Sequence, residues 1–475
     1  MERRLIGKRP TFHNSRQGPN FYRVVVLLAM ILAALWLIAG IDRGQVRSPL
    51  DPTPTPTRVS QSYLMEAQAY FDAGRLDDPS NTAAGVAAPP INDAIEAYQA
   101  ALEEAPENAQ VWAELARIQT YSSSMLRNDT ERLARMEEAL ASANKAVELE
   151  PDDSNAHAIR AFVLDWYAFN GLVEAEQRQE LLIEAEREAS RAFQLDPESA
   201  QALAFYAEIL ADESKWLQAE KYAVQAVQKD PNSMDTHRVY AYVLETLGQY
   251  NSAIQQYQRA AEIAPNMTFL YIRIGSNYRE GIKNSDKALE YFDRAAKIND
   301  QLGVQNPTPY LEIARTYTQL GQFFAASINA EKALSLDNIN AQTYGQIGMI
   351  YRRARNYEGA MPLLKCAVRG CTAEENELGK VAVEGLPLTS VTVAYYYVEY
   401  GTNLAFLSRP NENYCPLAYE VLGEVRRAYP NDPVLMSIVE DSEGLCRRLE
   451  SGQVPVPTIT PMPTETPEPT VAPGI

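Results

Sequence analysis

The sequence predicts an all-α solenoid of about nine helix–turn–helix units, preceded by one transmembrane helix. The first observation behind this prediction is a pattern that returns after 34 residues: Ala219, Ala223, Ala226 and Pro231, then Ala253, Tyr257, Ala260 and Pro265. Small residues at this spacing share one face of a helix, and the proline ends it. The second observation is a single long uncharged stretch near the start of the chain.

That stretch, residues 24–41, contains eighteen uncharged and mostly apolar residues. As a helix it would span about 27 Å, close to the hydrocarbon thickness of a bilayer. Six basic residues precede it, so the positive-inside rule leaves residues 1–23 in the cytoplasm and the rest of the chain outside. A cleaved signal peptide, which would give a secreted protein, is the competing interpretation.

Two segments rich in proline and threonine flank the predicted repeats. Residues 42–59 form a linker, which alternating proline favours as extended polyproline II. Residues 451–475 have the same composition and cannot build a core, so a disordered or extended tail is expected.

Between these segments, two helical patterns alternate. Residues 60–372 contain eight units, and 373–450 contain a ninth, degenerate unit and a capping helix. The second and third units carry about twelve extra residues, expected to lengthen helices or loops on one rim. The first helix of the fifth unit carries the pattern His237, Tyr240, Ala241 and Leu244.

A 34-residue helix–turn–helix unit with these residues resembles the tetratricopeptide repeat. The resemblance covers roughly residues 60–450 and implies a right-handed superhelix. In that family the first helices line a concave groove that receives a peptide or protein segment.

Charge and motif content narrow the range of functions. Residues 1–47 carry a net charge of +6, 48–58 carry zero and 451–475 carry −2, which leaves −23 for residues 59–450. An acidic body does not favour nucleic-acid binding. The three histidines lack partners at metal-ligand spacing, and no catalytic or phosphate-binding motif occurs. We therefore expect no catalytic residue, metal or cofactor.

The four cysteines lie near the C-terminal end of the array. An even number outside the cytoplasm suggests disulfides, and four cysteines allow three pairings. The repeat topology implied by the resemblance selects Cys366–Cys371 and Cys415–Cys446. The alternative is four buried free thiols.

The resemblance also selects candidate groove residues: Arg238, Tyr242, Arg279, Arg315 and Arg352. Arginines on a concave wall could bind carboxylates, which suggests an acidic or C-terminal segment as ligand. The alternative is that these arginines pair with neighbouring acids such as Glu280 or Glu312. Tyr242 could also stack on a peptide side chain or a sugar ring.

The function predicted from these features is a non-enzymatic scaffold or adaptor, tethered to the cell membrane by residues 24–41. Its partner is expected to be a protein or peptide segment. Two alternatives stay open at this point: a carbohydrate- or cell-wall-binding envelope module, and an accessory subunit of a secretion or polysaccharide-export complex.

Overall fold

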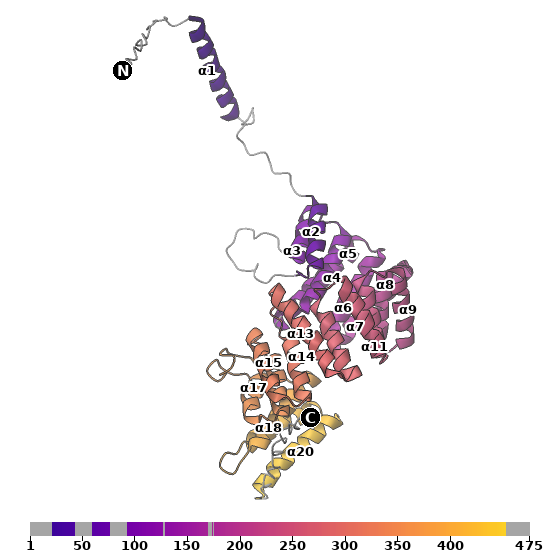
Figure 1. Ribbon diagram of the computed structural model, residues 1–475, viewed down its shortest axis with the longest axis vertical. Coiled ribbons are helices and arrows are strands. Elements are labelled where there is room, and N and C mark those ends of the chain that lie inside the picture. The colour runs from indigo at the N-terminus through magenta and orange to yellow at the C-terminus, as the bar shows by residue number, and fades with distance from the viewer. Residues whose placement is uncertain are drawn as a thin grey trace, which may run out of the picture. The chain divides into compact units, whose positions relative to one another are not determined.

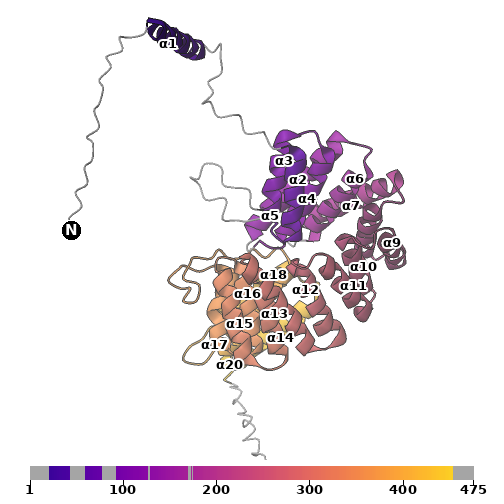
Figure 2. The same ribbon diagram turned by 45° about the horizontal axis from the view of Figure 1, so that its top comes forward.

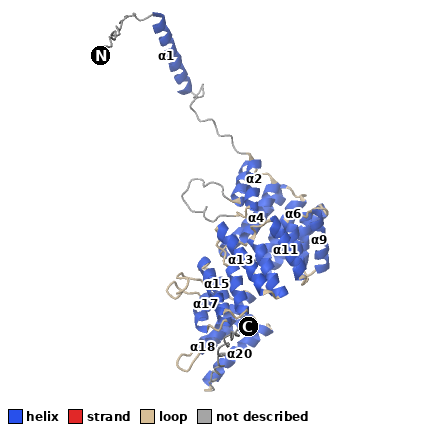
Figure 3. Ribbon diagram, in the orientation of Figure 1, coloured by secondary structure: helices blue, strands red, loops and turns tan. Residues whose placement is uncertain are grey.

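The structure is a computed structural model that describes residues 21–42, 59–76, 93–126, 129–169, 173 and 175–452 (Figure 1). The chain divides into two units, Met1–Arg58 and Val59–Ile475. Helix α1 (Phe21–Asp42) belongs to the first unit, and the remaining helices belong to the second. Every regular element in the described ranges is a helix (Figure 3), which confirms the all-α prediction.

Helix α1 covers the stretch predicted to span a membrane. Among the residues that the structure describes, no helix combines the length and apolar character needed to cross a bilayer. The structure therefore does not support the predicted transmembrane helix at 24–41. The predicted cytoplasmic segment, most of the linker and most of the tail lie outside the described residues.

The second unit is a succession of helix pairs, which confirms the predicted repeat array. Nine pairs and a last single helix follow one another within the described residues. The pairs are α2 (Ser60–Asp72) and α3 (Ala94–Glu104); α4 (Ala109–Ser123) and α5 (Asp129–Leu149); α6 (Ser154–Phe169) and α7 (Ala175–Leu195); α8 (Ala200–Asp212) and α9 (Trp216–Lys229); α10 (Met234–Thr246) and α11 (Tyr250–Ile263); α12 (Thr268–Ser276) with the π-helix η2 (Asn277–Ile282) and α13 (Ser285–Leu302); α14 (Thr308–Gln319) and α15 (Phe323–Leu336); α16 (Ala341–Arg353) and α17 (Tyr357–Arg369); α18 (Val391–Leu407) and α19 (Cys415–Ala428), before α20 (Pro433–Glu450).

Small residues recur at the positions where the two helices of a pair pack closely against each other. A Cβ atom on Gly275 of α12 would lie 2.5 Å from the ring of Phe292 on α13. A Cβ atom on Gly348 of α16 would lie 2.7 Å from Leu364 on α17. These distances are too short for any larger residue, so the size of the side chain on the second helix fixes the residue on the first.

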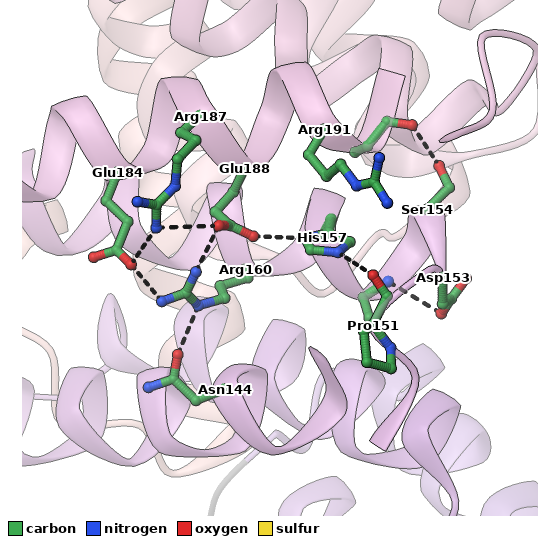
Figure 4. Close-up of polar contacts among 12 residues, drawn as sticks. Asn144, Pro151, Asp153, Ser154, His157, Arg160, Glu184, Arg187, Glu188 and Arg191 are labelled. Atoms are coloured by element: carbon green, nitrogen blue, oxygen red, sulfur yellow. Dashed lines mark hydrogen bonds and ion pairs between the residues drawn. The ribbon is translucent and has the colours of Figure 1, made fainter. Parts of the chain in front are cut away.

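Five of the turns between pairs are closed by a hydrogen bond across six residues. The His157 Nε2 group donates to the Pro151 carbonyl at 2.8 Å (Figure 4). The same bond is made at equivalent places by the following side chains: Trp112 to Pro106, His237 to Pro231, Tyr271 to Pro265, and Tyr344 to Asn338. In four of these five turns, the proline that follows one helix thus also supplies the acceptor that positions the next.

The second and third pairs have the longest second helices of the regular stack. Helices α5 and α7 are 21 residues long, whereas α9 and α11 have 14. Much of the extra length predicted for these units is therefore helix.

The array curves back on itself, so early pairs contact later ones (Figure 2). The Asn266 side-chain amide donates to the Ala73 carbonyl at 3.0 Å, 193 residues away in sequence. The Asn306 amide donates to the Ser124 carbonyl at 2.7 Å, 182 residues away. The first six pairs therefore share one continuous core, which extends from Ala67 to Ile298.

The last pairs are held by two disulfides. Cys366 and Cys371 join the end of α17 to the connection that follows, with S–S 2.02 Å. Cys415 and Cys446 join α19 to α20, with S–S 2.09 Å. The structure thus contains the pairing that the repeat topology implies.

Candidate functional site: the inner face of the array and an outer apolar surface

Arg238, predicted to face an open groove, lies at the centre of a filled interior. Its side chain is only 5 % exposed, and its guanidinium forms two hydrogen bonds of 2.6 Å to the Glu208 carboxylate. The same guanidinium lies 5.3 Å from the ring centre of Phe162 and 5.5 Å from that of Trp166. Because its guanidinium is buried among these acceptors and rings, Arg238 makes its contacts inside the protein and is not available to a ligand.

Side chains of helix α4 reach across this inner face to α10 and α12. Arg117 Nη1 lies 3.1 Å from Asp235 Oδ2 on α10, and the Tyr121 hydroxyl donates to the other oxygen of Asp235. The Tyr121 ring also stacks on Phe269 of α12, with centres 5.5 Å apart. The groove predicted along pairs two to six is therefore closed by the curvature of the array.

Tyr242, the other groove residue of this region, belongs to a buried acidic cluster. Its hydroxyl donates to Asp212, which in turn shares a hydrogen bond with Asp165. Desolvation raises the pKa of Asp212 to about 6. Desolvation, together with the neighbouring Asp212 and Glu208 carboxylates, raises the pKa of Asp165 well above its ordinary value. The folded protein thus favours a protonated carboxyl group between these two residues.

The three later arginines form a ladder of contacts from one pair to the next. Arg279 Nη2 lies 2.5 Å from Glu312 Oε2, and its Nε lies 2.8 Å from Glu280. The remaining contacts are those of Arg315 with Glu312 and with Gln346 at 2.9 Å, and of Arg352 with Glu399 at 2.7 Å. The contacts match the alternative that the sequence left open, in which acids of the protein itself pair with these arginines.

A second polar cluster surrounds His157 on α5, α6 and α7 (Figure 4). His157 Nδ1 lies 2.6 Å from Glu188 Oε2, an arrangement that a catalytic base could have. Both ring nitrogens are occupied, however, because Nε2 donates to the Pro151 carbonyl. Since other turns make the same bond with Trp or Tyr, the role of this histidine is to hold the turn. Among the described residues, no group of three or more His, Cys, Asp or Glu could hold a metal ion.

Sequence reasoning missed Asp235 and Tyr121, because neither belongs to the repeated pattern. It also missed an exposed apolar surface on the last regular pairs. We call this the α15–α17 surface; it comprises Leu320, Phe323, Phe324 and Ile328 and the adjoining pocket between α15, α16, α17 and residues 375–378. The pocket has a volume of about 520 Å³. Adjacent phenylalanines at the start of a second helix were the available signal.

Comparison with known proteins gives matches to repeat proteins. Two family models described as tetratricopeptide repeat match residues 210–268 and 307–340. No curated protein sequence matches the chain.

Three similar solved structures illustrate the likeness. They are YrrB, described as a TPR protein with an unusual peptide-binding site (22 % identity, 43 % of this chain and 94 % of that chain, TM-score 0.25); TTC0263, a thermophilic TPR protein of Thermus thermophilus (19 %, 46 % and 98 %, 0.35); and a human IFIT1 dimer with PPP-AAAA (18 %, 71 % and 73 %, 0.47). Repeated helix pairs and the two family matches agree on one conclusion: residues 210–268 and 307–340 are tetratricopeptide repeats, set in an all-α array of similar helix pairs.

Proposed function

We propose that this protein is a non-enzymatic scaffold that holds a segment of a partner protein on the outside of a cell membrane. The observation that carries the proposal is the α15–α17 surface. Phe324 is 81 % exposed and Ile328 is 50 % exposed, one turn apart on α15, and Leu320 and Phe323, where α14 connects to α15, are exposed as well. Grouped large apolar side chains on a folded surface mark interaction sites.

The inner face is a poorer candidate for partner binding. An acidic ligand at Arg238 would have to displace Glu208, and the displaced carboxylate would stay buried without a counter-charge. At Arg279 it would have to compete with Glu312, which Arg315 also holds in place. Ring stacking on a sugar is not favoured either, because the Tyr242 hydroxyl is held by Asp212 and the Arg273 guanidinium already lies 5.6 Å from the centre of the Tyr242 ring. The geometry therefore favours a protein partner on the outer face.

Tethering to the membrane is part of the proposal and rests on the sequence. Residues 24–41 are uncharged and mostly apolar, and basic residues precede them. Two disulfides in the repeat unit support an oxidising compartment for that unit. The proposed arrangement is a short cytoplasmic N-terminus and extracytoplasmic repeats.

The test is capture of partners by the full chain purified in detergent. The chain is immobilised and incubated with solubilised envelopes of the source organism, and retained proteins are quantified by mass spectrometry. We expect one or a few proteins in near-stoichiometric amounts. Retention of nothing above the background of bare resin would refute the scaffold function. Digestion of the repeats by protease added to intact cells would test the proposed orientation independently.

A further inference from the structure

We infer that the α15–α17 surface binds a basic, apolar segment of the partner protein, on the convex side of the array. The inference rests on the proposed scaffold function and names the chemistry of the partner. Three features of the surface support it: an apolar strip, an adjoining pocket with an acidic rim, and a carbonyl group freed by a proline.

The apolar strip runs along α15 towards the pocket. Phe324, Ile328 and Glu331 follow one another at spacings of four and three residues, so they lie on one face of the helix. Glu331 and Ser327 already belong to the pocket wall. Strip and pocket therefore form one continuous surface, apolar at the start of α15 and polar further along.

The pocket is acidic. Four glutamates line it, Glu331, Glu358, Glu375 and Glu377, and none of its lining residues is basic. Two of them have partners in the protein: Glu375 pairs with Lys365 at 2.6 Å, and Glu331 accepts a hydrogen bond from Tyr351 at 3.1 Å. Within the described part of the chain, neither Glu358 nor Glu377 has an ion-pair or hydrogen-bond partner. Their negative charge is available to a ligand.

Proline at position 362 adds an uncharged acceptor to the same wall. Pro362 lies inside α17 and has no N–H group, so it cannot make the helical bond to the carbonyl of Glu358. Glu358, Gly359 and Pro362 all line the pocket. A guanidinium or ammonium group placed there could bind both the carbonyl and the two carboxylates.

The occupant is identified by this combination of properties. Leu363 and the half-exposed Leu378 give the pocket apolar walls, suited to the aliphatic stem of Arg or Lys. The glutamates suit the charged head, and Phe324 with Ile328 suits an apolar neighbour in the partner. Like charge disfavours an acidic segment in this pocket.

The experiment uses the full chain in detergent and measures binding by fluorescence anisotropy. The probe is a short labelled peptide of alternating arginine and leucine, and its comparison is the same peptide with glutamate for arginine. Empty micelles give the background. Phe324→Ser with Ile328→Ser removes the strip, Glu358→Gln with Glu377→Gln removes the charge without changing shape, and Leu217→Ser is the control because Leu217 is equally exposed (83 %) on a different helix.

We expect the arginine peptide to bind and the glutamate peptide not to bind. The strip variant should weaken binding at least about tenfold, because it removes two large apolar side chains and the burial of one alone accounts for about that factor. The glutamine variant should weaken it about threefold to tenfold and reduce its salt dependence. The Leu217 variant should stay within about twofold of the parent, in line with the usual effect of a remote surface substitution.

Three results would overturn the inference. The first is equal peptide binding by the parent and both surface variants. The second is equal binding of the arginine and the glutamate peptide. The third is a strip variant that changes the oligomeric state in sedimentation and leaves peptide binding intact, which would identify a second copy of the chain as the occupant. Envelope capture separates this inference from the proposed function. If parent and strip variant retain the same partner equally, the scaffold function holds and this surface is wrong; if the parent retains none, the function itself fails.

Discussion

Replacement of Asp212 by asparagine should stabilise the protein at neutral pH. Asp212 ends α8, accepts the Tyr242 hydroxyl and shares a hydrogen bond with Asp165. Two carboxyl groups in contact cannot both ionise without repulsion in a desolvated site. Asparagine keeps an acceptor for Tyr242 and supplies a donor for Asp165, so the change removes the charge and preserves the contacts.

The size of the effect follows from the pKa of Asp212, which burial raises from 3.8 to about 6. The folded protein therefore binds this proton more tightly than the unfolded chain does, and stability falls as pH rises from about 4 to above 6. A pKa that is higher by about two in the folded protein than in the unfolded chain corresponds to about 3 kcal/mol of unfolding free energy. Because Asp165 shares the proton, we expect Asp212→Asn to add about 1–3 kcal/mol to the free energy of unfolding at about pH 7.5 and close to nothing at about pH 4.

The assay is urea unfolding of the full chain in detergent, followed by tryptophan fluorescence at the two pH values. Asp152→Asn is the control, because Asp152 is exposed and pairs only with Arg191 at the surface. A variant no more stable than the parent at the higher pH would refute the reasoning. Equal stabilisation at both pH values would show that shape, and not proton binding, causes the change.

Three further substitutions test other parts of the structure. His157→Gln should lower the free energy of unfolding below about pH 6.5, because the hydrogen bond to Glu188 raises the pKa of His157. This stabilisation is lost as pH rises through the raised pKa, so the variant and the parent should differ less at higher pH. The measurement is unfolding curves across pH, and His237→Gln is the control because the partner of His237, Gln256, is neutral. Gly275→Ala should lower the unfolding free energy by about 1–3 kcal/mol through its clash with Phe292, whereas Gly423→Ala in α19 should be tolerated. Arg238→Met should cost about 3–5 kcal/mol in the same measurement, since it leaves a buried carboxylate unpaired; an unchanged midpoint would show that this ion pair is dispensable.

The helix pairs could be predicted because their determinants are local. Gly275 and Phe292 belong to one helix pair, so the two residues that must fit together both lie within one 34-residue repeat of the sequence. The same holds for the proline turns, where donor and acceptor lie six residues apart. Because these contacts join residues that are close in sequence, the residues they require recur at regular intervals along the chain.

The filled inner face could not be predicted in this way. Arg117 and Tyr121 meet Asp235 because the whole array curves, and the curvature is a sum of small rotations between pairs that no single residue specifies. The family resemblance placed Arg238 on an open wall, whereas the curvature buried it. Arg279 and Arg315 were ambiguous for another reason: an arginine that binds a ligand and one that pairs with a neighbouring glutamate look alike in a sequence.

The contact between Tyr121 and Asp235 also has a consequence for biosynthesis. The two residues are separated by 114 positions, so the hydroxyl of Tyr121, whose ring already packs on Phe162 and Trp166, lacks this acceptor until that much more chain has left the ribosome. Contacts of such long range slow folding and leave apolar groups exposed meanwhile. A nascent chain that ends before α10 should therefore be the species that a chaperone recognises, and release should follow the synthesis of α12, when Phe269 closes over the ring.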